Sequence, residues 1–418
     1  MNIFSIREFE PEPIAKVVDL MEKKPLADIR VVGVGTAGVN VIAYMVQSDL
    51  TGVKFIAINT DKQHLDALKG AETLQIGSNR TGGRGSGGDT LIGEQAANED
   101  REKIAKSIAG ADLVFLTTGL GGGTGTGALP IIAKIAREQG ALTVAVVTLP
   151  FAIEGDERMG IAEEGIKKLQ EIVDTHIVIP NENLYKLIDN KTSIRQTFKY
   201  ANDILCQGVR SISDLVTKVG FINLDFADVE AVIKGQGVAH LGIGVGRGDS
   251  RADNAAKDAI DNTLLDNLSI EGASRLLVNI AGPEEFPMAE VHEILNIVRT
   301  KVGSSAKLKF GITFDSELGE DVKVTVIATG FQSAAAAAGQ EDNSRKKTKE
   351  ADNFIDFKRF EEMRGGLRDK RPLHDHYYGI TKPREFHENL EVPTALRKHN
   401  LDQNDGSGEK SAAGGKDA

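Results

Sequence analysis

Short apolar runs alternate with amphipathic segments through the first part of the chain. Helix-like stretches include Val39 to Val46 and Gly127 to Gln139. The runs that suit buried strands lie at 29–34, 53–58, 113–116, 143–148 and 176–179. This alternation predicts an α/β domain with a mostly parallel sheet and helices on both faces.

A long helix is predicted after this domain. From Ile194 to Val219, apolar residues recur at three- and four-residue steps, which is typical of one helix with a buried stripe. Further strands are predicted at 238–245, 275–280, 307–313 and 322–329, with helices at 252–265 and 288–302. The pattern therefore indicates a second α/β domain that ends near Phe331.

The end of the chain has a different pattern. An alanine run follows Phe331, and then charged residues crowd a stretch with too little apolar surface to offset chain ordering. Apolar residues return among charges from Phe386 to Lys398, before a Gly/Ser/Lys-rich end. The predicted parts are an N-terminal extension (1–28), a first domain (29–192), a central helix (193–220), a second domain (221–331), a flexible linker (332–385), a tail peptide (386–400) and a disordered end (401–418).

Composition narrows the classes of function. A chain of 418 residues fits two domains plus tails, and its formal charge of -11 disfavours binding to nucleic acid. Cys206 is the one cysteine, so neither a disulfide framework nor a thiolate metal site is expected. Met1 to Asp28 contains no uninterrupted apolar block, so we expect a cytoplasmic protein without membrane insertion.

A first glycine loop follows the first predicted strand. Gly33 to Gly38 matches the dinucleotide pattern GxGxxG between a strand and a helix, and Asp61 lies at about the separation expected of a ribose-binding acid. Taken alone, this loop favours NAD or FAD, and a tight strand-to-helix turn without a ligand is the alternative.

A second glycine loop changes this balance. The strand-like run Leu113 to Gly119 leads into Gly121-Gly-Gly-Thr-Gly-Thr-Gly127, which then enters a predicted helix. Glycine lets the backbone approach phosphate oxygens, and a helix N-terminus presents unpaired N–H groups and a positive dipole end. The loop therefore predicts a cradle for a di- or triphosphate.

A third glycine cluster, Gly82 to Gly88 followed by Asp89, could close over a terminal phosphate. No GxxxxGK[ST] motif occurs in these loops, so the lysine of P-loop enzymes is missing. Backbone N–H groups, helix dipoles and a divalent ion must then neutralise the phosphates. The chemistry implies Mg²⁺, with no ligand motif to identify its protein ligands.

These motifs together resemble the tubulin/FtsZ family of GTPases, and within it the bacterial cell-division members. The resemblance rests on Gly121 to Gly127, joined in the family's order to Asn59-Thr-Asp61, Asn202-Asp203 and Asn223-Leu-Asp-Phe-Ala-Asp228. It covers roughly Ile29 to Phe331 and the short tail peptide. It implies a tubulin-like fold, in which a Rossmann-like GTP-binding domain and a C-terminal α/β domain are joined by the long central helix.

The resemblance also implies a GTP site. Gly35 to Asn40 and Ser86 to Gly88 would line the phosphates, while Phe198 would stack on the base and Asp203 would read the guanine edge. The residues implied for GTP binding are Gly35, Thr36, Ala37, Gly38, Val39, Asn40, Asn59, Ser86, Gly87, Gly88, Gly121, Gly122, Gly123, Thr124, Gly125, Thr126, Glu154, Arg158, Phe198, Asn202 and Asp203. Members of the family commonly continue with glycines where Thr36, Ala37 and Val39 stand here, so altered phosphate geometry is expected.

Catalysis is expected between subunits. In the implied fold, Asn223, Asp225 and Asp228 lie at the far end of the central helix from the chain's own nucleotide. Head-to-tail stacking would bring them against the next chain's γ-phosphate, where carboxylates can orient and polarise water. Hydrolysis of GTP would then require assembly.

The resemblance predicts a self-assembling filament protein of the cell-division ring at mid-cell. The tail peptide from Phe386 to Lys398 would bind membrane-tethering and regulatory division proteins, ordering on contact. Two alternatives remain at this point: a tubulin-like scaffold with negligible hydrolysis, and an NAD-dependent oxidoreductase built on Gly33 to Gly38.

Overall fold

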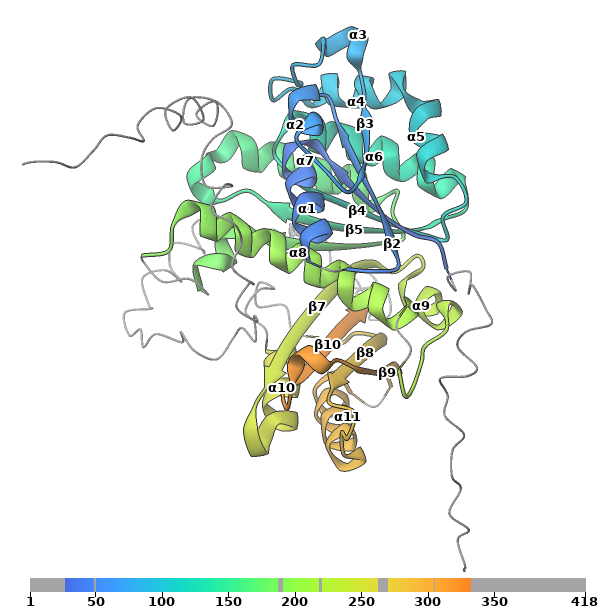
Figure 1. The fold of residues 1–418 in the computed structure, drawn as a ribbon, viewed down its shortest axis with the longest axis vertical. Coiled ribbons are helices and arrows are strands. Elements are labelled where there is room, and N and C mark those ends of the chain that lie inside the picture. The colour runs from blue at the N-terminus through green and yellow to red at the C-terminus, as the bar shows by residue number, and fades with distance from the viewer. Residues whose placement is uncertain are drawn as a thin grey trace, which may run out of the picture. The chain divides into compact units, whose positions relative to one another are not determined.

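The first half of the chain forms a six-stranded parallel sheet in the order β3-β2-β1-β4-β5-β6 (Figure 1). The computed structural model describes residues 27–48, 50–186, 191–217, 220–261, 270–303 and 305–331. Its elements here are β1 (Ile29–Val34), α1 (Gly35–Gln47), β2 (Val53–Asn59), α2 (Lys62–Asp66), β3 (Glu72–Gln75), α3 (Ser78–Thr81), α4 (Thr90–Glu99), α5 (Arg101–Ile108), β4 (Leu113–Gly119), α6 (Gly123–Glu138), β5 (Leu142–Leu149), α7 (Asp156–Gln170) and β6 (Thr175–Pro180).

Two hydrophobic clusters cover the two faces of this sheet. Alternate strand residues such as Val31 and Phe115 point into a cluster with α1, whereas Val32 and Leu116 point into a cluster with α4, α5, α6 and α7. This alternation follows from the period of two in a strand, and both faces are apolar because both are covered. The predicted parallel sheet with helices on both faces is confirmed.

The predicted long helix is α8 (Ile194–Thr217), which crosses between the two sheets (Figure 1). Its buried residues Ala201, Leu205, Val209 and Ile212 join the same core cluster as α1. That cluster also contains Leu277 of the second sheet, so α8 packs against both halves of the chain.

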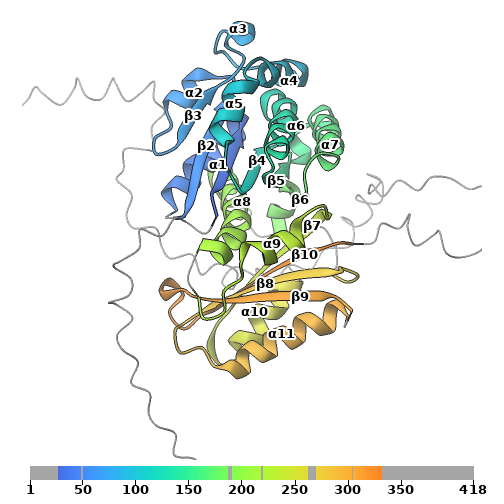
Figure 2. The ribbon, with the colours of Figure 1, turned by 90° about the vertical axis from the view of Figure 1, so that its right-hand side faces the viewer.

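The second sheet has the order β7-β10-β8-β9 and is mixed. Its antiparallel pairs are β7–β10 and β10–β8, whereas β8–β9 is parallel. Helices α10 and α11 pack on the face that lies away from α8 (Figure 2). The elements are α9 (Phe226–Ile233), β7 (Gly237–Gly246), α10 (Arg251–Ile260), β8 (Arg275–Gly282), α11 (Met288–Val302), β9 (Lys307–Phe314) and β10 (Val322–Thr329).

A short parallel pairing joins the two sheets, because Thr175 and His176 of β6 pair with Gly237 and Val238 of β7. The described residues thus have the α/β, tubulin-like organisation that was expected, with α8 as its central helix. The N-terminal extension (all but its last two residues), the linker (332–385), the tail peptide (386–400) and the end of the chain (401–418) lie outside the described residues.

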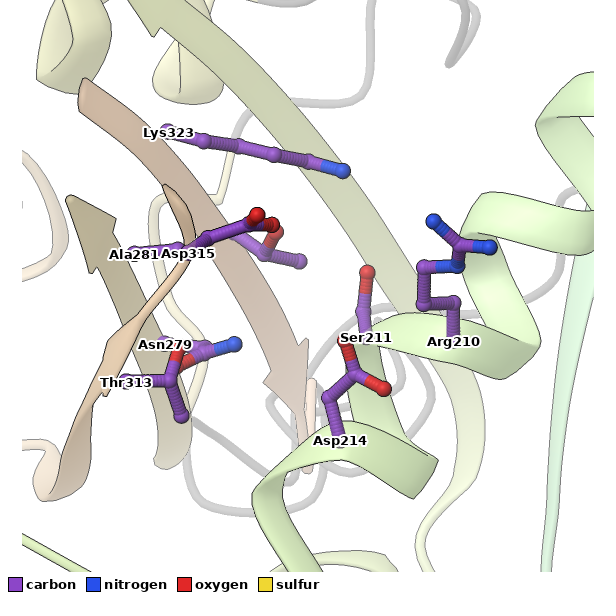
Figure 3. A pocket seen from close by; sticks show the side chains of 9 residues that line it. Arg210, Ser211, Asp214, Asn279, Ala281, Thr313, Asp315 and Lys323 are labelled. Atoms are coloured by element: carbon purple, nitrogen blue, oxygen red, sulfur yellow. The ribbon is translucent and has the colours of Figure 1, made fainter. Parts of the chain in front are cut away.

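A polar cleft lies where α8 faces the second sheet (Figure 3). Arg210 and Asp214 project from α8, and Lys323 and Asp315 project toward them from the sheet side (Figure 3). Burial lowers the pKa of Lys323, and the Arg210 charge lowers it further. The contact between α8 and the second sheet is therefore apolar on one part and charged on another.

Candidate functional site

The glycine loops of the first domain converge on one cleft of about 260 Å³ that opens to solvent. The lining residues are Gly35, Thr36, Ala37, Asn59, Asp61, Gly85, Ser86, Gly87, Gly88, Thr118, Gly119, Gly122, Gly123, Thr124, Gly125 and Arg158. All three predicted loops therefore contribute to the same site, which lies at the carboxyl ends of the parallel strands β1, β2 and β4.

The first two loops meet backbone to backbone. A Cβ atom on Gly35 would lie 2.8 Å from the Gly125 nitrogen, and Gly35 has a φ of +70°. Because any side chain here would push the loops apart, glycine is required at this point. Thr36 and Ala37 lie inside α1 instead. These two positions, where the family commonly has glycine, therefore have helical backbone here and do not need a positive φ.

Two helices begin at the cleft. Helix α1 begins at Gly35 and α6 at Gly123, each four residues earlier than the sequence pattern indicates. The glycine runs are therefore the first turns of the helices, whose free N–H groups and positive dipole ends lie at the cleft. Neither helix has a side-chain cap, so these N–H groups are left for an anion.

A chain of buried hydroxyls ties the third loop to the second loop and to the end of β2. Thr124 Oγ1 donates to Ser86 Oγ at 3.0 Å, and the hydroxyls of Thr60 and Thr124 are 2.7 Å apart. Since Thr124 donates to Ser86, Thr60 donates to Thr124. The chain links the end of β2, the loop at Ser86 and the first turn of α6.

The imidazole of His64 contacts two of the asparagines predicted for this site. His64 Nε2 lies 3.1 Å from Asn40 Oδ1, and His64 Nδ1 lies 3.4 Å from Asn59 Nδ2. Burial lowers the pKa of His64, which favours the neutral ring with its proton on Nε2. His64 carries no motif, so the sequence pattern did not indicate it.

Arg158 is the one basic residue among those that line the cleft. Its guanidinium donates to Glu154 Oε2, and Glu154 Oε1 in turn accepts from the Phe151 backbone N–H at 2.9 Å. Glu154 thus holds Arg158 at the rim without lining the cleft itself. The exposed fraction of the Arg158 side chain is 51%, so the pair remains open to solvent.

The residues predicted to bind the base lie on the N-terminal half of α8. Phe198 is 45% exposed and meets Phe151 edge to face, with ring centroids 5.6 Å apart. Asp203 Oδ1 accepts from the Tyr44 hydroxyl at 2.8 Å, and Oδ2 accepts from Gln207 Nε2 at 2.7 Å. The carboxylate of Asp203 is therefore held in a fixed orientation by two donors.

Several predicted residues support the cleft without lining it. Gly38 packs where a Cβ atom would lie 2.7 Å from the Thr117 carbonyl oxygen, and Val39 is 2% exposed in the core. Thr126 Oγ1 accepts from the Gly121 N–H at 2.9 Å and so fixes the turn before α6. Other predicted residues that lie outside the lining are Asn40, Glu154, Phe198, Asn202 and Asp203.

Sequence reasoning did not assign Thr118 and Gly119 to the site, although both line the cleft. Asp61, which was considered as the ribose-binding acid of a dinucleotide site, and Gly85 of the third glycine cluster also line it. Asp61 Oδ1 caps α2 by accepting from the backbone of Gln63 and His64. The position of Asp61 directly after β2 is the signal that singled it out in the sequence.

The cleft offers oxygen donors to a hard cation. Asp61 supplies a carboxylate, and Thr124 and Ser86 supply hydroxyls, which suit a Mg²⁺ ion held mainly by phosphate oxygens and water. In the part of the chain that the structure describes, no group of three His, Cys, Asp or Glu side chains could hold a metal by itself. The donor set therefore fits Mg²⁺ bound together with a nucleotide.

The three predicted catalytic residues lie after α8: Asn223 and Asp225 in the loop that leads to α9, and Asp228 in the first turn of α9, and together they form the acidic loop. Asn223 Oδ1 accepts from the Gly220 N–H at 2.6 Å, and Asp225 Oδ1 caps α9 through the Asp228 N–H at 2.7 Å. Asp228 Oδ1 lies 2.6 Å from Lys309 Nζ. From Asp203 to the end of α8 at Thr217, the helix rises about 21 Å, so the loop lies far from the chain's own cleft.

Comparison with known proteins agrees with this architecture. The model of the tubulin/FtsZ family GTPase domain matches residues 28–189, and the model of the FtsZ family C-terminal domain matches residues 237–332. The chain is also similar to an empty FtsZ dimer from M. jannaschii, at 42% identity and a TM-score of 0.71, covering 77% of this chain and 93% of that one. The chain belongs to the tubulin/FtsZ family.

Two further solved structures are similar. A point mutant of FtsZ from M. jannaschii is 43% identical with a TM-score of 0.70, over 73% of this chain and 91% of that one. CetZ2 from Haloferax volcanii, a GTPγS-bound protofilament, shares the fold at 23% identity and a TM-score of 0.62, over 74% of this chain and 96% of that one. These matches do not separate bacterial from archaeal members of the family.

Family membership fixes the general chemistry. The GTPase domain model over residues 28–189 supports binding of GTP and GDP and, in general terms, hydrolysis of GTP. Within the described ranges, no helix has the length and apolar character needed to cross a membrane.

Proposed function

We propose that this chain is a GTP-dependent filament protein of cell division, which assembles head to tail and hydrolyses GTP at the joint between subunits. The observation that carries the proposal is the separation of two incomplete sites along α8. The phosphate-binding cleft lies beside α1 and α6, and the acidic loop with Asp225 and Asp228 follows the other end of α8. One chain cannot bring its own two sites together, but a stacked pair can.

The cleft would bind the triphosphate mainly through backbone N–H groups. The N-termini of α1 and α6 supply these donors, and the Thr124 and Ser86 hydroxyls add to them. Mg²⁺, when bound with the nucleotide, would neutralise phosphate charge near Asp61 and Thr124. Asp203 would accept from guanine, whereas adenine would leave this carboxylate unpaired.

The loop of the next subunit would complete the site. Asp225 and Asp228 would orient and polarise the water that attacks the γ-phosphate, and Asn223 would hold the loop through its bond to Gly220. Since these residues come from the neighbour, hydrolysis would depend on assembly. The related dimer and protofilament structures support self-association as the context for this chemistry.

The observations favour this function over its two alternatives. Family membership favours GTP over NAD as the ligand of the Gly33 to Gly38 loop. A scaffold with negligible hydrolysis was motivated by Thr36, Ala37 and Val39, yet Thr36 and Ala37 lie on helical backbone at the cleft and Val39 lies in the core. The altered loop therefore gives little reason to expect the loss of turnover.

The proposal also includes a location and a partner-binding role in the cell. We place the filament in the cytoplasm, at the mid-cell ring of a bacterial or archaeal cell. The tail peptide from Phe386 to Lys398 would bind membrane-tethering and regulatory division proteins, and it lies outside the described residues. Binding would order this peptide on its partner.

Phosphate release measured beside sedimentation tests the proposal. Turnover of GTP per subunit should rise with protein concentration in parallel with the sedimented fraction, and ATP and NAD should support neither. Turnover that stays constant down to concentrations where all protein is monomeric would contradict catalysis between subunits.

A further inference from the structure

Lys309 of β9 forms an ion pair with Asp228 at 2.6 Å, across the gap between β9 and the first turn of α9. The side chains are partly open to solvent, with 48% of Lys309 and 28% of Asp228 exposed. The hydrogen bond and the charge of Asp228 raise the pKa of Lys309, and the charge of Asp225 raises it further. Lys309 therefore pairs directly with the carboxylate of Asp228.

The positive charge of Lys309 could offset negative charge at a joint between subunits. A loop that carries Asp225 and Asp228 toward a bound triphosphate brings like charges together, which opposes the close approach of the carboxylates to the γ-phosphate that turnover needs. On the cleft side, Arg158 is the one basic lining residue, and it is already paired with Glu154. The sequence of the glycine loops supplies no P-loop lysine. The described cleft thus offers little positive charge to offset the incoming acids.

We propose that Lys309 is a positioning residue for GTP hydrolysis, which holds the Asp228 carboxylate toward the joint and offsets its charge against the neighbour's triphosphate. The proposal rests on hydrolysis in trans, as proposed above. Lys309 acts through Asp228, so its contribution should disappear when the Asp228 carboxylate is removed.

A purely structural role for the pair is a poor explanation. Exposed ion pairs contribute little to folding stability. Helix α9 is anchored instead by Val229, Val232 and Ile233, all buried in the core cluster that also contains α8 residues. Lys309→Met should therefore fold and leave the chain's own GTP cleft unchanged.

Three variants test the proposal in the full-length chain. Lys309→Met removes the charge, Lys309→Arg keeps it, and Lys307→Met removes an exposed charge two residues away on the same face of β9. GTP affinity, sedimentation and turnover per sedimented subunit are measured for each. We expect Lys309→Met to lose turnover by roughly tenfold or more, the scale for a group that orients a catalytic side chain. Lys309→Arg should recover part of the loss, and Lys307→Met should match the wild type.

A double-variant cycle shows whether Lys309 acts through Asp228. In an Asp228→Asn background, adding Lys309→Met should cause no further loss, because the carboxylate that Lys309 positions is gone. A further loss equal to that of the single variant would overturn the proposal. Unchanged or faster turnover in Lys309→Met would also overturn it, and so would loss of assembly, which would assign Lys309 to docking.

The wild-type chain separates failure of this inference from failure of the proposed function. If wild-type turnover per subunit does not depend on assembly, hydrolysis in trans is wrong and the inference falls with it. If wild-type turnover depends on assembly while Lys309→Met behaves like Lys307→Met, only the role of Lys309 is wrong.

Discussion

The Tyr44 hydroxyl donates to Asp203 Oδ1 at 2.8 Å and thereby joins α1, which begins at the glycine-lined cleft, to the N-terminal half of α8. Burial and the Asp203 charge raise the pKa of the Tyr44 phenol, so it stays a donor at neutral pH. Its partner carboxylate is then fixed as an acceptor. An acceptor at this point suits the N–H groups of guanine.

Tyr44→Phe should weaken GTP binding and reduce discrimination against ATP, because Asp203 loses one of its two orienting donors. A hydrogen bond to a charged group contributes about 1.5 kcal/mol or more, which corresponds to a loss of affinity of roughly tenfold. Equilibrium binding of GTP and ATP to the nucleotide-free protein measures both effects. Asp203→Ala is the reference, and adding Tyr44→Phe to it should change nothing further.

A methyl group should have a large effect at one of two adjacent glycines and almost none at the other. A Cβ atom on Gly123 would lie 2.6 Å from the Asp89 nitrogen and 2.5 Å from Ser86 Oγ, whereas a Cβ atom on Gly122 would meet nothing within 4 Å. Gly123→Ala should therefore lower the free energy of unfolding by about 1–3 kcal/mol, the cost of overpacking. Gly122→Ala, with a φ of -96°, should leave it nearly unchanged. Urea unfolding of both variants without nucleotide checks the difference, and equal stabilities would contradict the loop packing described here.

His176 should make the protein less stable in mild acid. The ring is 3% exposed, its Nδ1 has no hydrogen-bond partner among the residues that the structure describes, and burial lowers its pKa from 6.5 to about 4. Between these two values the unfolded chain binds more protons than the folded one. The stabilisation is therefore complete above pH 6.5 and is lost as the pH falls toward 4, amounting to about 3 kcal/mol.

His176→Leu provides the control for this pH dependence. Its free energy of unfolding should fall less steeply than that of the wild type between pH 6.5 and 4, whatever the constant cost of the substitution. Urea titrations at a series of pH values give both slopes. Parallel curves would show that His176 is not the group responsible.

Much of the fold could be predicted because its strands are buried on both faces. Runs such as Val31 to Val34 and Leu113 to Leu116 are apolar throughout, and this pattern is visible in the sequence alone. The strand β3 was not predicted, because Glu72 to Gln75 is a short, partly exposed edge strand without an apolar run. Its pairing with β2 depends on contacts that the local sequence does not encode.

The start of α6 shows why the sequence pattern placed the beginning of this helix too late. Glycine disfavours helices, so the run from Gly121 to Gly127 was predicted as a loop. In the structure, a Cβ atom on Gly127 would lie 2.0 Å from the Thr90 carbonyl oxygen, so close packing of α4 on α6 requires glycine inside the helix. Tertiary packing therefore outweighs the local preference.

The parts of the site that glycine motifs form could be predicted from the sequence. The parts that depend on single side chains could not. The three glycine loops were indicated by their composition and do line one cleft. Tyr44, His64 and Lys309 carry no motif, and their importance follows only from the partners that the fold brings to them. A partner distant in the sequence leaves no local signal.

Mixing two defective chains should restore activity if the site is shared. Asp228→Asn keeps its cleft but loses the carboxylate, whereas Arg158→Ala keeps its acidic loop but loses the one basic residue that lines its cleft. Each variant alone should hydrolyse GTP slowly. In a mixed filament, some joints combine the intact cleft of an Asp228→Asn chain with the intact loop of an Arg158→Ala chain, and these joints are complete.

Random incorporation at equal concentrations makes about one joint in four complete, because a head-to-tail interface takes a different surface from each chain. Turnover of the mixture should therefore approach a quarter of the wild-type rate, well above the mean of the two variants alone. Phosphate release at several mixing ratios should show a maximum near equal proportions. Co-sedimentation of a tagged Arg158→Ala chain with untagged Asp228→Asn confirms that mixed filaments form. If they form and turnover stays at the mean of the separate variants, the carboxylate and the cleft act within one chain.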